Sequence, residues 1–206
     1  TYLEKNKILV KAVLKYFPGF KILEYGGMKM ATWNSRGLRG STLEVFINHT
    51  CELYREKKLA LIQKVPTPIT PVQIDQKSRH ITLAYFEKKS TVDYIGAVQG
   101  IPVCFDAKEC NTDVFPLQNI HQHQVNFMKD FEEQQGLAFL IVYFSHRDEI
   151  YYLTFRQMYN VWERGREGGS RHFKYQELDP RWFLQRKGNI LVPFLDGIQM
   201  DLDSRE

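Results

Sequence analysis

One uninterrupted apolar segment, LAFLIVYF at residues 137–144, constrains the fold of this chain more than any other feature. It is too short to cross a bilayer, which takes about 20 apolar residues. Its length and composition are typical of a β-strand, and the absence of polar residues predicts that both faces of the strand are covered. Such a strand belongs inside a sheet with helices on both sides, so we expect an α/β fold.

The rest of the chain supplies the neighbours that this strand needs. Further strands are predicted at residues 59–65, 81–88, 92–98, 101–108 and 149–155, and helices at 3–17, from Ser41 onward and from about Gln118 to Gln134. The pair Gln99–Gly100 predicts a tight hairpin between two of these strands. Together the elements predict a central mixed β-sheet flanked by helices.

A proline-rich stretch, PTPITPVQIDQKSRH at 66–80, interrupts the strands. Three prolines followed by polar and basic residues favour a protrusion that leaves the sheet. Lys77 and Arg79 near its far end are candidates for phosphate contacts, with plain solubility as the alternative. Tyr85 and Phe86, just beyond the stretch, are expected to pack in the core and across strands.

Positive charge is concentrated at the start of the chain. Residues 1–40 hold eight lysines and arginines against two glutamates, whereas the whole chain has a net charge of +4. A basic N-terminal arm suits a polyanionic partner, because phosphate contacts release condensed counterions. Arg36 and Arg39 are the arm residues that we expect to contact phosphates. A solvated, basic helical face is the alternative.

Hydropathy and the cysteine positions argue against a membrane protein, a secreted protein and a zinc-binding protein. No apolar run in the sequence is long enough to span a membrane, and the first residues lack a signal-peptide core. Cys51, Cys104 and Cys110 form no CxxC pair, and no cysteine–histidine spacing suits zinc. We therefore expect a reduced, cytoplasmic setting and no association with a membrane.

Two aspartates and a lysine form the strongest candidate for chemistry. Asp93 lies at the start of one predicted strand and Asp106 lies in the next, across the predicted hairpin. Asp106 and Lys108 are two apart in a strand, so they project from the same face. Two carboxylates converging there would repel each other unless a cation lay between them, and oxygen ligands suit Mg²⁺. Lys108 could then orient a water or neutralise a phosphate. Ordinary strand-end charges with a surface Asp106–Lys108 pair are the alternative.

Other polar positions have structural interpretations. Ser41–Glu44 has the spacing of a helix-capping box, in which the glutamate reaches back to the first amide. Gln118, near the start of a predicted helix, fits polar surface. His121 and His123 look like a metal pair, but an i,i+2 spacing on a helix would point them far apart, so we do not assign them as ligands.

Several separated motifs match one known family in the same order. They are RGLRGSTLEVFINHT, KVPTPITPVQI, AYFEKKSTVDYIG, FDAKE and FPLQNIHQHQVNFMKD, within roughly residues 36–164. In these blocks the chain resembles the RecU family of Holliday junction resolvases, which have the restriction-endonuclease-like fold. The resemblance implies a nuclease domain at 41–206 with a protruding stalk at about 66–80, and this domain follows the basic N-terminal helix and arm that the residues predict at 1–40.

The resemblance also implies an activity. Family members act as homodimers that bind four-way DNA and nick two strands symmetrically with Mg²⁺ or Mn²⁺, in recombination and repair. The implied metal ligands are Asp93 and Asp106, and the implied catalytic residues are Asp93, Asp106, Lys108, Glu44, Thr91 and Gln118. A strand-exchange recombinase or a branch-migration motor is the implied protein partner.

The chain departs from the family pattern at several places. Most members resemble FEAKE where this chain reads FDAKE, and the stretch between Ile74 and Ala84 is several residues shorter than usual. Family arms are also typically polar and flexible, whereas residues 3–17 here have a helical pattern. These departures leave open a junction-binding recombination factor with weak or no cleavage, and a nuclease of the same fold with another substrate.

Overall fold

The computed structural model of the chain describes residues 41–86 and 91–205. The helix predicted at 3–17 and the arm residues Arg36 and Arg39 lie outside the described residues. The described elements are α2 (Thr42–Glu56), β1 (Leu61–Lys64), β2 (Ile69–Asp75), β3 (His80–Phe86), β4 (Tyr94–Val98), β5 (Ile101–Cys110), β6 (Val114–Pro116), η1 (Leu117–Asn119), α3 (Gln122–Glu133), β7 (Leu137–Phe144), β8 (Glu149–Thr154), α4 (Phe155–Arg166), β9 (His172–Lys174), η2 (Tyr175–Glu177), η3 (Pro180–Trp182), β10 (Phe183–Leu184) and α5 (Phe194–Ser204).

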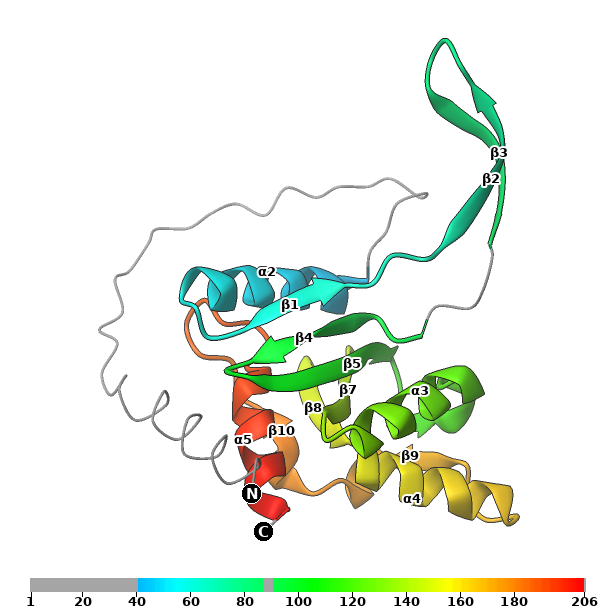
Figure 1. Ribbon diagram of the computed structural model, residues 1–206. Coiled ribbons are helices and arrows are strands. Elements are labelled where there is room, and N and C mark those ends of the chain that lie inside the picture. Colours follow the sequence, from blue (N-terminus) through cyan, green and yellow to red (C-terminus); the bar gives the residue numbers. More distant parts are fainter. Residues whose placement is uncertain (1–40, 87–90, 206) are drawn as a thin grey trace.

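A six-stranded mixed sheet forms the centre of the molecule, in the order β1-β4-β5-β7-β8-β10 (Figure 1). Only the β5–β7 pair is parallel among the described pairs of this sheet. The β4–β5 connection is the predicted tight hairpin, in which both Gln99 and Gly100 have positive φ angles. The predicted central mixed sheet is therefore confirmed.

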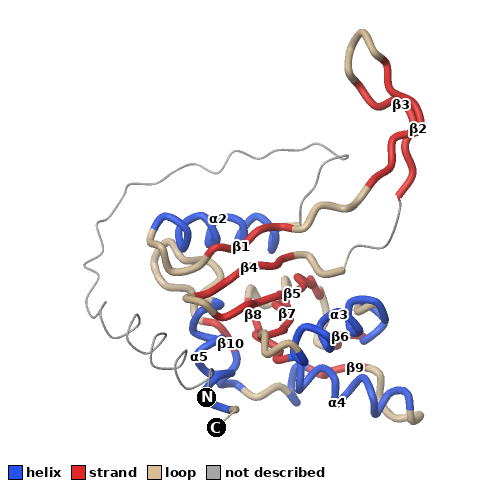
Figure 2. The backbone as a smooth tube through the Cα atoms, viewed as in Figure 1, coloured by secondary structure: helices blue, strands red, loops and turns tan. Residues whose placement is uncertain are grey.

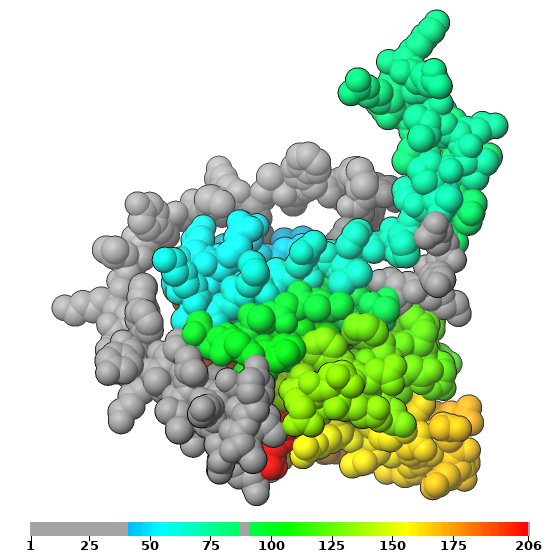
Figure 3. All heavy atoms as spheres, in the orientation of Figure 1, coloured from blue at the N-terminus to red at the C-terminus, as the bar shows by residue number. Residues whose placement is uncertain are grey.

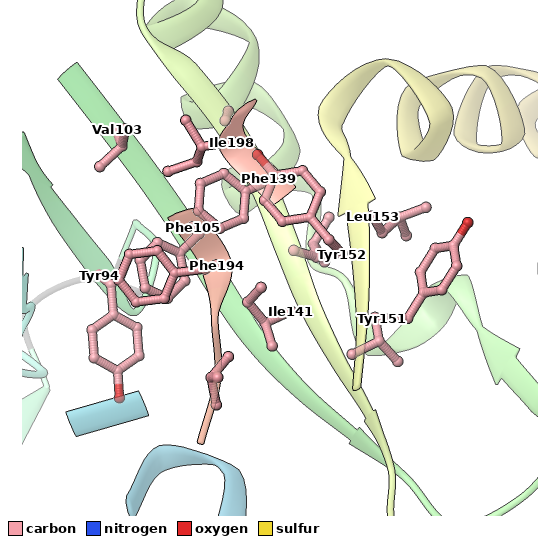
Figure 4. Close-up of a cluster of buried hydrophobic side chains, with 14 of the residues drawn as sticks. Tyr94, Val103, Phe105, Phe139, Ile141, Tyr151, Tyr152, Leu153, Phe194 and Ile198 are labelled. Carbon is pink, nitrogen blue, oxygen red and sulfur yellow. The ribbon is translucent and has the colours of Figure 1, made fainter. Parts of the chain in front are cut away.

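The apolar strand β7 lies inside this sheet, and all of its side chains are buried. A row of stacked aromatic rings crosses four neighbouring strands at this level (Figure 4). Phe105 of β5 stacks on Tyr94 of β4 and on Phe139 of β7, each with ring centroids 4.8 Å apart. Phe139 stacks in turn on Tyr152 of β8 at 4.4 Å. This row ties the strands together across the sheet.

Helices cover both faces of the sheet. Phe194 of α5 packs on Phe105, so α5 lies on the face toward which Phe105 points. Asn48 of α2 accepts a hydrogen bond from the Tyr94 hydroxyl on that same face. The helix α3 covers the opposite face, where Gln124 reaches Asp106. Among the described residues, no helix combines the length and the apolar character needed to cross a membrane.

The hairpin β2–β3 projects from the body as a separate two-stranded ribbon, which is the predicted stalk (Figures 2 and 3). The prediction ended the stalk at residue 80 and placed 81–88 in the central sheet, and that placement was wrong. The strand β4 already pairs with β1 on one side and β5 on the other, which leaves no position beside it for β3. Tyr85 and Phe86 are consequently 56% and 73% exposed, so the prediction that they pack in the core was also wrong.

Candidate active site

The structure brings Asp93 and Asp106 together at one end of the β4–β5 hairpin. The Asp93 amide donates to Oδ1 of Asp106 at 3.1 Å, and the Ala107 amide donates to Oδ2 of Asp93 at 3.0 Å. This reciprocal pairing follows from the strand register, in which Tyr94 lies opposite Phe105 and the two aspartates come next in line. Each carboxylate is therefore held by the backbone of the other strand.

Lys108 and Gln124 complete the group, and we call Asp93, Asp106, Lys108 and Gln124 the carboxylate cluster. The Lys108 ammonium forms an ion pair with Asp106 on the shared face of β5. Gln124, in the first turn of α3, donates from Nε2 to both oxygens of Asp106 at 3.0 Å. Its Oε1 lies 3.5 Å from the Lys108 Nζ. The side chain of Gln124 thus links the helix to both charged groups of the strand.

Burial controls the charge of Asp106, which has no exposed surface. Desolvation raises the pKa of Asp106 to about 7, the ammonium of Lys108 opposes this rise, and the Asp93 carboxylate adds to it. Burial therefore disfavours the ionised form of this carboxyl group, and the neighbouring ammonium favours it. A cation placed beside the two carboxylates would favour the ionised form.

The donor set of the carboxylate cluster fits a divalent ion such as Mg²⁺. This ion is usually held by one or two carboxylates together with water and a substrate phosphate. Gln124 turns its Oε1 toward the His121 amide at 3.0 Å, so its amide group supports the Asp106 carboxylate instead of offering it an oxygen. No group of three or more His, Cys, Asp or Glu side chains suited to a metal occurs in 41–86 and 91–205. Asp93 and Asp106 would therefore hold the ion, and water and substrate would complete its shell.

A comparison with protein families shows the family of the chain. The family model for RecU, Recombination protein U, matches residues 38–200, which include the whole carboxylate cluster. The chain belongs to the RecU family. The predicted family resemblance is thereby confirmed.

Curated RecU relatives match most of the chain. A protein of Pediococcus pentosaceus named Holliday junction resolvase RecU is 35% identical over 173 residues, which cover 82% of this chain and 86% of the relative. A protein of the same name from Oceanobacillus iheyensis is 38% identical over 160 residues, covering 76% of this chain and 78% of the relative. Among solved structures, Hjc of Archaeoglobus fulgidus, a Holliday junction resolvase, is similar to 56% of this chain and 75% of its own, with a TM-score of 0.34 and 11% identity.

Glu44, which the RecU resemblance implies as an acidic contributor, lies in the first turn of α2. Its amide donates to the Ser41 Oγ at 3.2 Å, which is one half of the predicted capping box. The second bond of the box, from the Ser41 backbone amide to the Glu44 carboxylate, was wrongly predicted. That carboxylate pairs instead with Lys64 of β1 at 2.5 Å. Lys64 lies opposite Tyr94, so this ion pair is next to the Asp93 end of the cluster without being part of it.

Thr91 and Gln118 are the other two residues that the RecU resemblance implies. Thr91 is half-buried in the bend that leads to Asp93. Gln118 is exposed on η1, and the helix predicted to begin there begins at Gln122. The glutamine that the structure brings to Asp106 is Gln124, which sequence reasoning missed. The signal that could have found it is the spacing of the HQHQ segment, in which Gln124 occupies the third position of the true helix.

The two histidines of that segment lie close together. The rings of His121 and His123 stack with centroids 5.4 Å apart, so the prediction that they point far apart was wrong. That prediction assumed that both residues are helical. His121 is the residue before α3 and has an extended backbone, with φ −88° and ψ 149°, which removes the helical angle between the two side chains.

The basic residues predicted to contact DNA on the stalk lie at its tip. Lys77 and Arg79 belong to the turn between β2 and β3, and Arg79 has a positive φ angle of 55°. The turn is held by Asp75, which accepts from the Lys77 amide at 2.9 Å and from the Ser78 hydroxyl at 2.8 Å. Both basic side chains are exposed, as a phosphate contact requires.

Proposed function

We propose that this chain is a Mg²⁺-dependent endodeoxyribonuclease that resolves four-way DNA junctions by paired nicks. The carboxylate cluster is the observation that carries the proposal, because it joins two carboxylates, an ammonium and an orienting amide at one end of the sheet. The relatives named Holliday junction resolvase RecU support four-way DNA as the substrate.

Each member of the cluster has a distinct role in phosphodiester hydrolysis. The carboxylates of Asp93 and Asp106 are fixed by backbone amides, so they can hold a cation without rearrangement of the strands. Lys108 places a positive charge beside them, where it would stabilise the charge that develops on the attacked phosphate. Gln124 positions the Asp106 carboxylate and the Lys108 ammonium relative to each other.

The divalent ion would supply the Lewis acidity that activates water and offsets phosphate charge. The products expected by resemblance to the family are a 5′-phosphate and a 3′-hydroxyl. Asp106 stands where most family members are expected to carry a glutamate, so its carboxylate reaches less far from the strand. The Asp106 carboxylate remains within hydrogen-bonding distance of the Asp93 amide, which supports a shared site despite the shorter side chain.

The proposed activity implies an assembly and a setting. A symmetric junction needs two coordinated nicks, so we infer a homodimer with two active sites. Cys51, Cys104 and Cys110 are free and buried, in keeping with a reduced cytoplasmic environment. A strand-exchange recombinase or a branch-migration motor is the proposed protein partner, on the basis of family resemblance.

Cleavage of synthetic DNA tests this proposal. A four-way junction and a linear duplex of the same sequence are incubated with the protein, with and without Mg²⁺. We expect paired nicks at symmetric positions of the junction, only in the presence of Mg²⁺, and little cleavage of the duplex. Binding of the junction without cleavage would indicate a recombination factor, and equal cleavage of both DNAs would indicate a nuclease with another substrate.

A further inference from the structure

Two histidines at the start of α3, His121 and His123, adjoin the carboxylate cluster and are not used by the proposed reaction. The His121 amide donates to the Gln124 Oε1 at 3.0 Å, and that oxygen lies 3.5 Å from the Lys108 Nζ. The Nε2 of the same side-chain amide donates to Asp106. One side-chain amide therefore separates the His121 backbone from both charged groups of β5.

The ring of His121 is exposed, yet two contacts restrict its orientation. The His123 ring stacks on one of its faces, with centroids 5.4 Å apart and planes 13° apart. In the capping box at the start of α3, one ring nitrogen of His121 faces the Gln124 amide. A nitrogen that faces an N–H group acts as an acceptor, so the proton of the neutral imidazole is on the other nitrogen. That second nitrogen is therefore a donor, and it has no hydrogen-bond partner among the described residues.

Capping of α3 does not by itself account for a histidine at this position. Serine, threonine, aspartate and asparagine are the preferred residues there, and each of them caps with a shorter side chain. The imidazole of His121 adds a second nitrogen beyond the one that faces the helix. A helix that needed only a cap would have no use for this additional donor.

The neighbouring carboxylate cluster indicates what the donor would bind. In the proposed reaction one phosphate of the DNA lies against Asp93 and Asp106, so the adjacent phosphates of the same strand pass along the edge of the cluster. Contacts to such phosphates fix the register of DNA on a protein. An imidazole N–H is a suitable partner for a phosphate oxygen, both as a neutral donor and as a cation.

We propose that His121 is a DNA-contacting residue whose ring donates to a phosphate next to the cleaved one. This inference rests on the proposed function and adds to it a contact that positions the substrate. The contact would fix which phosphodiester of the strand lies at the two aspartates, because a substrate held in register presents its reacting bond to the catalytic groups.

A coupling measurement between the protein and single phosphates of the DNA tests this contact. Affinities of the full chain for a four-way junction are measured without divalent ions, and each phosphate near the point of strand exchange is replaced in turn by a neutral methylphosphonate. His121→Ser is the test variant, because serine keeps a preferred capping group and lacks the second nitrogen. It should weaken binding of the unmodified junction by about fivefold, the typical effect of one hydrogen bond. At the contacted position, a methylphosphonate should weaken the wild type about fivefold more than it weakens His121→Ser.

The matched control is His49→Ser, which replaces an exposed histidine of α2 on the other face of the sheet. It should leave the affinity and every methylphosphonate effect at the wild-type values. A purely structural role of His121 would lower the affinity for all modified junctions by the same factor. Such additive effects at every phosphate would overturn the proposal, as would an unchanged affinity of His121→Ser.

Nicking of the unmodified junction with Mg²⁺ separates this contact from the proposed function. In an active protein the coupled phosphate should lie next to the mapped nick, and a coupled phosphate elsewhere on the junction would contradict the proposed position of His121. A wild type that shows the coupling and does not nick would contradict the nuclease and support the contact.

Discussion

The strands β5 and β3 are both largely apolar, yet their environments are opposite. In β5 the residues from Val103 to Asp106 are buried, and the Asp106 carboxylate is covered by the sheet and by α3. In β3 every side chain is exposed or half-buried, because the stalk has no helix or second sheet to cover it. Apolar character alone therefore predicts a strand in both cases, but only the layers around the strand decide whether it is buried.

The same contrast applies to the charged groups of the two regions. The carboxylate cluster holds its charges by hydrogen bonds from two strands and one helix, with Asp106 and Gln124 buried and Asp93 and Lys108 half-buried. Lys77 and Arg79 extend from an exposed turn that is held only by local contacts to Asp75. The proposed function assigns the chemistry to the body and the contact with DNA to the stalk, and each of these proposed roles can be tested separately.

The largest loss of cleavage activity is expected when either of the two aspartates of the body, Asp93 or Asp106, is replaced. Asp93→Asn and Asp106→Asn each remove a metal-ligand charge and keep the shape of the side chain, so nicking of a four-way junction should be lost. Binding of the junction should persist, because phosphate affinity depends mainly on basic residues. A gel shift and a cleavage assay on the same labelled junction measure both effects. Cleavage retained by either variant would contradict the role of the cluster.

A smaller loss of cleavage rate is expected when Gln124, which orients Asp106, is replaced. Gln124→Ala should slow cleavage by about tenfold, as is typical when a residue that supports a metal ligand is removed. Lys129→Gln, on an exposed part of the same helix, serves as the control and should cleave at the wild-type rate. Single-turnover rates at saturating DNA compare the two variants. Equal rates would show that Gln124 has only a structural role.

The stalk should affect selectivity more than rate. Lys77→Ala/Arg79→Ala should weaken binding of a junction more than binding of a duplex, because the tip would meet phosphates that a linear duplex cannot present together. Loss of two phosphate contacts should reduce the slope of log affinity against log salt by about two units per protomer. Arg36→Ala/Arg39→Ala is the comparison, since an arm should contact any DNA backbone. Equal losses on both DNAs for the stalk variant would rule out junction recognition by the stalk.

The smallest effect concerns the pH dependence of stability. Burial raises the pKa of Asp106 from 3.8 to about 7, so between these values the folded chain holds more protons than the unfolded chain. The free energy of unfolding should therefore fall as the pH rises through this range, in the absence of metal. Asp75 on the stalk has the opposite sign, because its hydrogen bond to the Ser78 hydroxyl lowers its pKa and its contribution is lost in acid. Urea unfolding at several pH values should show a weaker fall in Asp106→Asn, and an unchanged fall would contradict the assignment.

The sequence predicted the parts of this structure that depend on local pattern. The apolar run at 137–144 is the strand β7, and the hairpin that brings Asp93 to Asp106 follows from Gln99–Gly100 and the strand register. The parts that depend on three-dimensional context were missed. Whether β3 joins the central sheet depends on which strands already pair with β4. These are β1 and β5, and the residues of β3 do not indicate this pairing.

The orienting amide was missed for a related reason. The predicted helix began at Gln118, whereas a short 3-10 turn precedes the true start of α3 at Gln122. Gln118 was implied by the family resemblance, and the predicted helix start, four residues too early, gave no sign that Gln124 lies in the first turn of α3. The same shift gave His121 a helical backbone that it does not have. Short turns of this kind depend on tertiary contacts, such as the Leu117 amide bonded to the Arg171 carbonyl at 2.9 Å.

Direct titration with a divalent ion tests the central claim, that Asp93 and Asp106 together hold the metal of a nuclease. Isothermal titration of Mg²⁺, or electron paramagnetic resonance with Mn²⁺, is carried out on the wild type, Asp93→Asn and Asp106→Asn. We predict that the wild type binds the ion and that both variants lose the same site. Metal binding that survives at full strength in both variants would contradict the account.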